Sequence, residues 1–321
     1  MSHEPGPKAG CPGRHAWQQL SRRQFVSSIV VGAAAGCASR TGMVPSDGGI
    51  AGMDTAPGAE PMPDTGAVKK TAADQVILGS TGITVSRLAM GSGTHGSGGA
   101  SDQTRLGIAG FASVLTHGYS QGLTFFETAD QYGAHPHMKE AIRQVGRQNV
   151  VVLTKTTAET AAGAQADLDR FRTELGIDTI DIVLLHNKTS RRWTTECEGA
   201  METLSRAKEA GAIRAHGVSC HSIEALRLAA ETPWVEVDLA RINPAGLIMD
   251  ADPATVISVL RQMKAAGKGV IGMKILGEGQ LGGSLDTAIP HAVKLDAIDA
   301  FTIGFTSNAQ LDQVTQKIAA V

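Results

Sequence analysis

The chain has 321 residues, 42% of them hydrophobic, and this length allows one α/β barrel of about 250 residues with further sequence beside it. Its 29 basic and 31 acidic side chains nearly balance, without a basic stripe, which argues against a nucleic-acid partner. A small molecule is the partner that this composition favours.

Residues 1–37 are predicted to be an export signal of the twin-arginine type. Arg22 and Arg23 precede an uncharged run, 25–36, which has about the length of a signal-peptide core and is too short to span a bilayer. Two outcomes of processing stay open, a lipid anchor at Cys37 or cleavage beside the preceding alanines. We therefore expect the twin-arginine machinery as a partner, a periplasmic location, and membrane contact only through such an anchor.

The segment that follows, residues 38–72, is rich in Gly, Pro, Ser, Asp and Met without periodicity, which predicts a flexible linker. The folded domain is expected over residues 73–321. Within it Cys197 and Cys220 belong to no CxxC motif or histidine cluster, so the sequence indicates no metal site. Sequence separation alone does not decide whether these two cysteines pair.

From Gln75 onward, short apolar runs alternate with longer amphipathic segments. The runs 76–78 and 83–85 enclose a Gly-containing turn and predict a β-hairpin. Eight later runs predict strands separated by helices: 88–91, 123–127, 150–155, 180–186, 213–219, 235–243, 269–274 and 300–304. Strict alternation of strand and helix predicts a parallel sheet of the α/β class, and eight repeats favour a closed (β/α)8 TIM barrel with the short hairpin at its bottom. No GxGxxG follows the first of these strands, which weakens the alternative of an open dinucleotide-binding sheet.

Four side chains that can transfer or stabilise protons fall at the ends of neighbouring predicted strands. Glu127, Lys155 and His186 end three strands, and Tyr132 follows five residues after Glu127. Carbonyl reduction leaves negative charge on oxygen, so it needs a proton donor and groups that stabilise that oxygen. We predict Tyr132 as general acid or base, Lys155 lowering its pKa, Glu127 anchoring Lys155, and His186 polarising the carbonyl.

Motifs from residue 75 to the end resemble those of the aldo-keto reductase superfamily. They include Leu78-Gly79-Ser80-Thr81-Gly82, Leu153-Thr154-Lys155, the run 181–186 and Gly217-Val218-Ser219. The resemblance implies a (β/α)8 fold, a nicotinamide cofactor lying across the strand ends, and a tetrad of carboxylate, Tyr, Lys and His. The carboxylate of that family is usually Asp, and here it is Glu127.

The resemblance also implies which residues hold the cofactor, NADP or NAD. Gln310 replaces the Arg that commonly grips the 2′-phosphate, and a neutral amide cannot supply a charge-assisted fork, so the choice between the two dinucleotides stays open. Cys220 replaces an Asn, and Met273 a stacking Tyr. The predicted contacts are Gly93, Thr94, Ser219, Cys220, Arg241, Met273, Lys274, Leu276, Gly277, Gly279, Gly304, Phe305, Thr306 and Gln310.

Substrate contacts are predicted at His95 and Trp193, in loops that should surround the carbonyl. The expected open cleft suits a bulky polar or sugar-like substrate. The predicted function is NAD(P)-dependent interconversion of a carbonyl and an alcohol, with a cofactor that binds before export and is retained. Two alternatives stay open, a catalytically decayed nicotinamide-binding sensor or accessory subunit, and a phosphate-binding barrel lyase or isomerase without nicotinamide.

Overall fold

The computed structural model describes residues 69–321. The predicted export signal, residues 1–37, and all but the last four residues of the predicted linker lie outside the described residues, so these two predictions stay predictions. None of the described helices combines the length and the apolar character that a membrane span requires.

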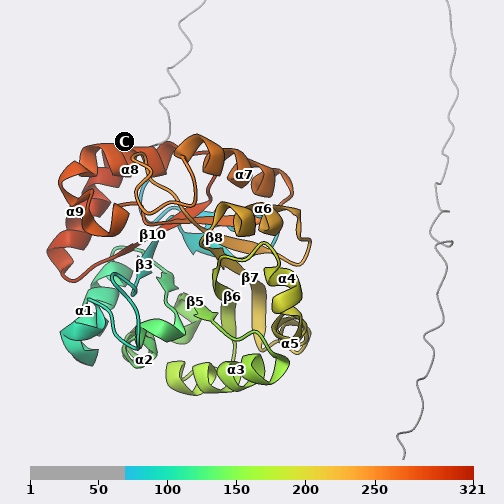
Figure 1. Ribbon diagram of the computed structural model, residues 1–321. Helices are drawn as coiled ribbons and strands as arrows, with labels where there is room; N and C mark the ends of the chain where they lie inside the picture. Colours follow the sequence, from blue (N-terminus) through green and yellow to red (C-terminus); the bar gives the residue numbers. More distant parts are fainter. Residues whose placement is uncertain (1–68) are drawn as a thin grey trace, which may run out of the picture. The chain divides into compact units, whose positions relative to one another are not determined.

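Eight parallel strands form a closed barrel in the order β10-β3-β4-β5-β6-β7-β8-β9, with helices around it (Figure 1). The ring closes where β10 pairs with β3, for example Thr302 with Ala89 and Gly304 with Gly91. The strands are β3 Leu88–Gly91, β4 Phe125–Glu127, β5 Val151–Thr156, β6 Ile180–Lys188, β7 Ile213–Cys220, β8 Val237–Arg241, β9 Gly269–Met273 and β10 Ala300–Gly304. The predicted (β/α)8 barrel is confirmed.

Helices connect the strands and cover the outside of the barrel. Several begin at a hydroxyl or carboxylate cap; the Thr160 side chain accepts from Gly163 N, and Ser222, Asp252 and Ser307 cap later helices in the same way. The helices are α1 Gly107–Ser120, α2 His135–Val145, α3 Ala161–Leu175, α4 Trp193–Glu196, α5 Glu198–Glu209, α6 Ile223–Glu231, α7 Pro253–Ala265, α8 Leu285–Lys294 and α9 Asn308–Ala319. Short 3-10 turns include η1 Thr104–Leu106, η2 Asp130–Tyr132, η3 Arg147–Asn149, η4 Gly277–Gly279 and η5 Gly282–Ser284.

The alternation of side chains along each strand decides which residues face the barrel interior. One buried cluster fills that interior, and a larger one packs the outer strand faces against the helices. The interior cluster takes residues from every strand of the barrel: Ala89, Phe125, Leu153, Ile182, Leu184, Ala215, Val237, Leu239, Ile271, Met273 and Ala300. Two residues further along their strands, the same inward face presents Glu127, Lys155, His186 and Thr302. The alternation therefore places these polar side chains at the C-terminal ends of the strands, next to the apolar cluster that fills the interior.

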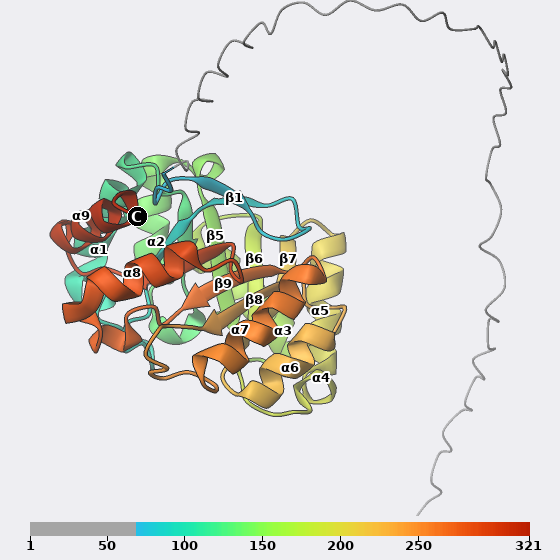
Figure 2. The same cartoon turned by 90° about the horizontal axis from the view of Figure 1, so that it is seen from above.

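The N-terminal hairpin consists of β1 Gln75–Ile77 and β2 Thr84–Ser86, which pair antiparallel. Its turn lies against the N-terminal end of β9, where Ser80 N donates to Gly267 O at 2.7 Å. Leu78, Ile83 and Val85 are buried in the same cluster as the barrel interior. Figure 2 shows the hairpin, in blue, outside the ring of strands. Its predicted place at the barrel bottom is confirmed.

Candidate active site

The four predicted catalytic residues come together at the C-terminal ends of adjacent strands. Glu127 ends β4, Lys155 lies in β5 and His186 in β6, while Tyr132 ends the 3-10 turn η2. Lys155 is fully buried, and Glu127 and His186 are each 5% exposed. A charged pair and an imidazole so far from solvent need partners among themselves.

Lys155 finds those partners on β4. Its Nζ forms a short ion pair with Glu127 Oε1 and donates to the carbonyl oxygen of Thr128 at 2.7 Å. The second oxygen of the carboxylate, Glu127 Oε2, accepts from Thr302 Oγ1 at 3.1 Å. The longer carboxylate therefore still contacts the lysine, as expected for an anchor of Lys155.

The phenol ring of Tyr132 lies against both Lys155 and His186. The Lys155 Nζ is 4.9 Å from the ring centroid, and the His186 ring stands edge-on at 5.7 Å, with 3.5 Å between the phenolic oxygen and Nε2. Gly93 and Gly96 make room for the ring, because a Cβ on either would lie 2.3 or 2.5 Å from its carbon atoms. Packing thus fixes the orientation of the phenol.

The lowering of the Tyr132 pKa that was predicted from Lys155 is outweighed in this structure by burial and by nearby carboxylates. Burial, followed by the carboxylates of Glu127 and Glu278, raises the Tyr132 pKa well above its usual range. The ammonium of Lys155 opposes this shift only in part, because the Glu127 carboxylate pairs with it at contact distance. Burial and the nearby Lys155 lower the pKa of His186 to about 2, so that its imidazole is neutral.

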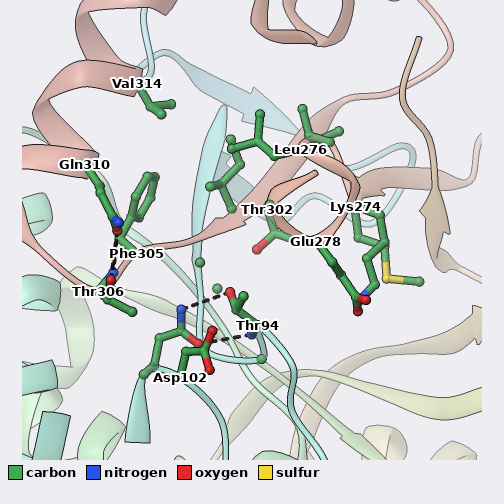
Figure 3. Close-up of a pocket in the computed structure, with 18 of the residues that line it drawn as sticks. Thr94, Asp102, Lys274, Leu276, Glu278, Thr302, Phe305, Thr306, Gln310 and Val314 are labelled. Carbon is green, nitrogen blue, oxygen red and sulfur yellow. Dashed lines mark hydrogen bonds and ion pairs between the residues drawn. The ribbon is translucent and has the colours of Figure 1, made fainter. Parts of the chain in front are cut away.

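A cavity of about 440 Å³ runs from Tyr132 and Glu127 along the ends of β3, β9 and β10 (Figure 3). The predicted substrate residue His95 lines it. So do ten of the fourteen predicted cofactor residues, namely Gly93, Thr94, Met273, Lys274, Leu276, Gly279, Gly304, Phe305, Thr306 and Gln310. Its volume lies in the range of small-molecule and cofactor sites, and its wall combines apolar side chains with a few polar groups.

The other predicted contacts lie elsewhere. Ser219 is buried in β7, and Gly277 is buried within the 3-10 turn η4. Arg241 is paired with Asp250 and donates to the carbonyl oxygen of His221 at 2.9 Å. None of these three lines the cavity.

Cys220 and Trp193 are corrections to the predicted site. Cys220 follows the inward-facing Ser219, so the pleat turns it outward, where its buried free thiol contacts Asp238. Trp193 is also fully buried, and its Nε1 donates to Ala225 O at 3.3 Å. Neither side chain reaches a bound substrate or cofactor in this arrangement.

Several residues that the sequence did not single out line the cavity. Gln103 Nε2 donates to Thr94 Oγ1 at 3.0 Å, and Asp102 Oδ2 accepts a hydrogen bond from His95 Nδ1 at 2.7 Å. Glu278 forms an ion pair with Lys274. No pattern indicated Gln103 or Asp102, whereas Glu278 lies between the predicted cofactor contacts Gly277 and Gly279.

The buried polar atoms of the barrel interior fit a nicotinamide. The hydroxyl of Ser219 and Nδ1 of His186 are both buried without a hydrogen-bond partner among the described residues. Unpaired buried polar atoms are rare in folded proteins, and a carboxamide can satisfy such donors and acceptors. The residues present are therefore compatible with the expected cofactor.

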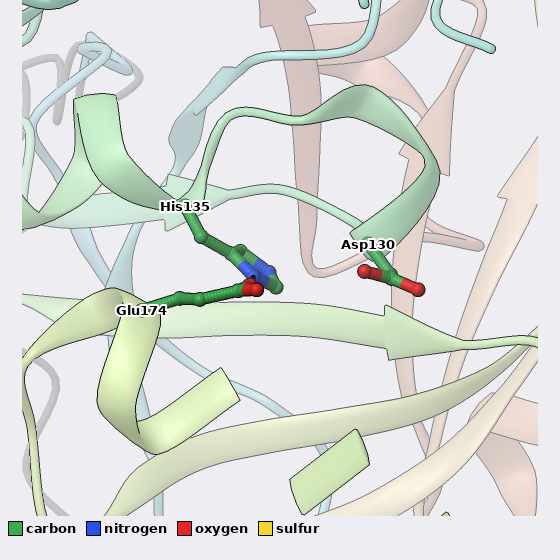
Figure 4. Close-up of side chains that lie close together, drawn as sticks. All are labelled: Asp130, His135 and Glu174. Atoms are coloured by element: carbon green, nitrogen blue, oxygen red, sulfur yellow. Dashed lines mark hydrogen bonds and ion pairs between the residues drawn. The ribbon is translucent and has the colours of Figure 1, made fainter. Parts of the chain in front are cut away.

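A second polar cluster, Asp130, His135 and Glu174, lies beside the site, with ligand atoms within 4.8 Å of one another (Figure 4). Both ring nitrogens of His135 are occupied, Nδ1 by Glu174 at 2.7 Å and Nε2 by Thr154 Oγ1 at 2.8 Å. The guanidinium of Arg170 reaches Asp130 at 2.6 Å and Glu174 at 3.2 Å. Arg170 thus supplies the positive charge of this cluster. Through Asp130 it also connects the turn that carries Tyr132 to α3.

Comparison with known proteins gives a consistent result. The model of the Aldo/keto reductase family matches residues 87–320. An aldo-keto reductase of Schizosaccharomyces pombe, named with NADP(+), is 29% identical over 167 residues, which are 47% of this chain and 48% of that protein. The chain thus spans about half the length of this curated relative.

Solved structures share the fold. A protein from Pseudomonas aeruginosa described as an aldo-keto reductase superposes with a TM-score of 0.66 at 21% identity, covering 78% of this chain and 98% of its own. An aldo-keto reductase from Bacillus halodurans, in its holo form, gives 0.63 at 14% identity, covering 78% and 92%. At these identities the likeness supports the barrel and not a particular substrate.

Proposed function

Because the chain belongs to the aldo/keto reductase family, we propose that it is a nicotinamide-dependent oxidoreductase that interconverts a carbonyl and an alcohol. The observation that carries the proposal is the packing of Tyr132 against Lys155 and His186 at the end of a cavity lined by ten of the predicted cofactor residues. The intact contact between Glu127 and Lys155 counts against a catalytically decayed sensor.

The protonation states of the site suit carbonyl reduction. When bound, the reduced nicotinamide supplies hydride to the carbonyl carbon. Tyr132 is protonated at neutral pH, and it can donate that proton to the carbonyl oxygen once hydride transfer has placed negative charge there, which completes the alcohol. Neutral His186 is placed to hydrogen-bond the same oxygen, and Lys155 stabilises the phenolate that remains until solvent returns a proton.

Replacing Tyr132 with Phe tests this role. Turnover of a panel of aldehydes and keto sugars should fall by about 10²- to 10⁴-fold, the usual contribution of a general acid. Dinucleotide affinity, measured by fluorescence titration, should stay within about twofold because the ring is retained. Undiminished turnover would reject Tyr132 as the proton donor.

The charges around the cavity favour NAD over NADP. Of the described cavity-lining residues, Lys274 and His95 carry the groups able to hold a positive charge, and each is paired with a carboxylate. At the far end Gln310 Oε1 accepts from Thr306 N at 2.8 Å and from Thr306 Oγ1 at 3.0 Å, and the side chain carries no charge. A 2′-phosphate would meet no free cation there.

A charge-restoring variant tests the cofactor preference. Gln310→Arg should strengthen NADP binding by about 10- to 150-fold, equivalent to 1.5–3 kcal/mol for a charge-assisted hydrogen bond, while NAD affinity changes little. Gln313→Arg, also on the cavity wall, is the matched control. Wild-type protein that already binds NADP more tightly than NAD would contradict the preference.

We propose, as the sequence predicts, that the substrate is a bulky polar or sugar-like carbonyl compound. Its support is the polar rim formed by His95 and Asp102, of which the His95 side chain is 56% exposed. Retention of the cofactor through export depends on the N-terminal segment outside the described residues and stays a prediction. Mass spectrometry of protein purified from the exported fraction tests it; protein without nicotinamide, with rapid cofactor exchange, would contradict it.

A further inference from the structure

The carboxylate of Glu127 links side chains from strands on both sides of it. Oε1 contacts Lys155 on β5, and Oε2 accepts from Thr302 on β10 at 3.1 Å. Since the barrel order is β10-β3-β4-β5, this hydrogen bond passes over the whole width of β3. Two strands that do not pair with each other are thus joined through one carboxylate.

The passage over β3 is open because its last residue is Gly91. A Cβ at this position would lie 2.7 Å from Thr302 Oγ1 and 3.0 Å from Glu127 Oε2. Any larger residue would press on both members of the hydrogen bond. The absence of a side chain at Gly91 therefore lets the two groups meet.

The longer carboxylate needs this second contact more than an aspartate would. Glu127 has one more rotatable bond, and it is 5% exposed, so an unpaired Oε2 would be a buried charged acceptor without a donor. Thr302 supplies the donor and removes the rotational freedom. With Oε2 fixed, Oε1 is directed at Lys155.

We propose that Thr302 is a positioning residue of the active site, which holds the Glu127 carboxylate on Lys155 across Gly91. The inference rests on the proposed function for its catalytic consequence. Thr302 acts through Glu127 and Lys155 on the proton donor Tyr132. It would also explain how this chain carries Glu where the related enzymes usually carry Asp.

A double-mutant cycle tests the proposal on the full chain. Thr302→Val keeps the shape and removes the donor, and Thr302→Ser keeps the hydroxyl. In Glu127→Asp the carboxylate withdraws by roughly 1 to 1.5 Å, beyond hydrogen-bonding reach of Thr302. Two quantities are measured for each variant, the rate of NADH-dependent reduction of 4-nitrobenzaldehyde and the equilibrium constant of unfolding in urea.

We expect Thr302→Val to lower kcat by about 5- to 150-fold, with the KM for NADH within about twofold, and to raise the unfolding equilibrium constant by a similar factor. Thr302→Ser should restore both quantities. In the Glu127→Asp background, Thr302→Val should change neither by more than about twofold, because the hydrogen bond is already lost.

Equal effects of Thr302→Val in both backgrounds would overturn the proposal and would mean that Thr302 acts on the cofactor or the fold directly. The urea measurement needs no substrate, so it tests the contact separately from the proposed function. If wild-type protein transfers no hydride to any carbonyl probe, the proposed function fails and the catalytic part of this inference with it.

Discussion

Asp238 on β8 gives the most direct test of the buried electrostatics. It points away from the barrel interior, it is fully buried, and the weak thiol donor of Cys220 is the side chain that contacts its carboxylate. Burial raises the pKa of Asp238 to about 8, the carboxylate of Asp250 adds to this shift, and Cys220 and Lys268 oppose it. The folded protein therefore keeps Asp238 neutral near pH 7.

This shift makes the stability of the protein depend on pH with a definite sign. The folded-state pKa of Asp238 lies above its ordinary value of 3.8, so the folded protein holds a proton that the unfolded chain releases between these two values. The stabilising contribution is complete below about pH 3.8 and is lost as the pH rises through about 8. The slope is about 1.4 kcal/mol per pH unit, or about 3 kcal/mol between pH 6 and pH 8.

The perturbation is Asp238→Asn, which has nearly the same shape and does not titrate. Urea unfolding at several pH values should show the variant gaining stability relative to wild type by about 1.4 kcal/mol per pH unit from pH 6 to 8, with no further gain above pH 9. Asp178→Asn, at an exposed position, is the matched control and should show a flat difference. A flat difference for Asp238→Asn as well would refute the assignment of a neutral buried carboxyl.

Three further results are expected. Glu278→Gln should tighten dinucleotide binding severalfold in a fluorescence titration, because Lys274 is released from its ion pair and can meet the pyrophosphate; weaker binding would mean that Glu278 itself contacts the cofactor. Arg170→Met should lower kcat by about tenfold through loss of its bond to Asp130, which begins the turn that carries Tyr132, and unchanged kinetics would show that packing alone holds the turn. Because the pKa of His186 is lowered to about 2, the dependence of kcat on pH should show no ionisation near pH 6.5 in the wild-type protein, and the profile of His186→Gln should have the same shape. An ionisation near pH 6.5 in wild type that is lost in His186→Gln would contradict the neutral imidazole.

The barrel was predictable because strand and helix patterns repeat in the sequence. The grouping of the four side chains was predictable because Glu127, Lys155 and His186 lie near the ends of neighbouring strands and Tyr132 follows in the loop after the first of them. Orientation of single side chains was harder to predict. Ser219 and Cys220 are adjacent, yet the pleat sends one inward and the other into the outer core. Thr302 is two residues beyond the interior Ala300 in an ordinary apolar strand, so its contact with Glu127 appears only when β10 closes the ring.

The raised pKa of Tyr132 could not be read from residue types either. Burial of the phenol contributes most to the rise, and the Glu127 carboxylate that pairs with Lys155 weakens the effect of the ammonium on it. The nearby Glu278 reaches the site through a loop with left-handed backbone at Lys274 and Glu278 itself, a conformation that side chains other than glycine seldom adopt. Such contacts depend on loop geometry, which spacing along the chain does not fix.

The hairpin at the barrel bottom also sets the timing of folding during synthesis. Ser80 bonds to Gly267, 187 residues further along the chain. At 5–20 residues per second the ribosome needs roughly 10 to 40 s to reach that partner. Until then the packing partners of Leu78, Ile83 and Val85 in the barrel are incomplete. Their apolar side chains must be kept from water by other contacts of the growing chain. This domain therefore completes its core only after Gly267 and the strands that follow it have been synthesised.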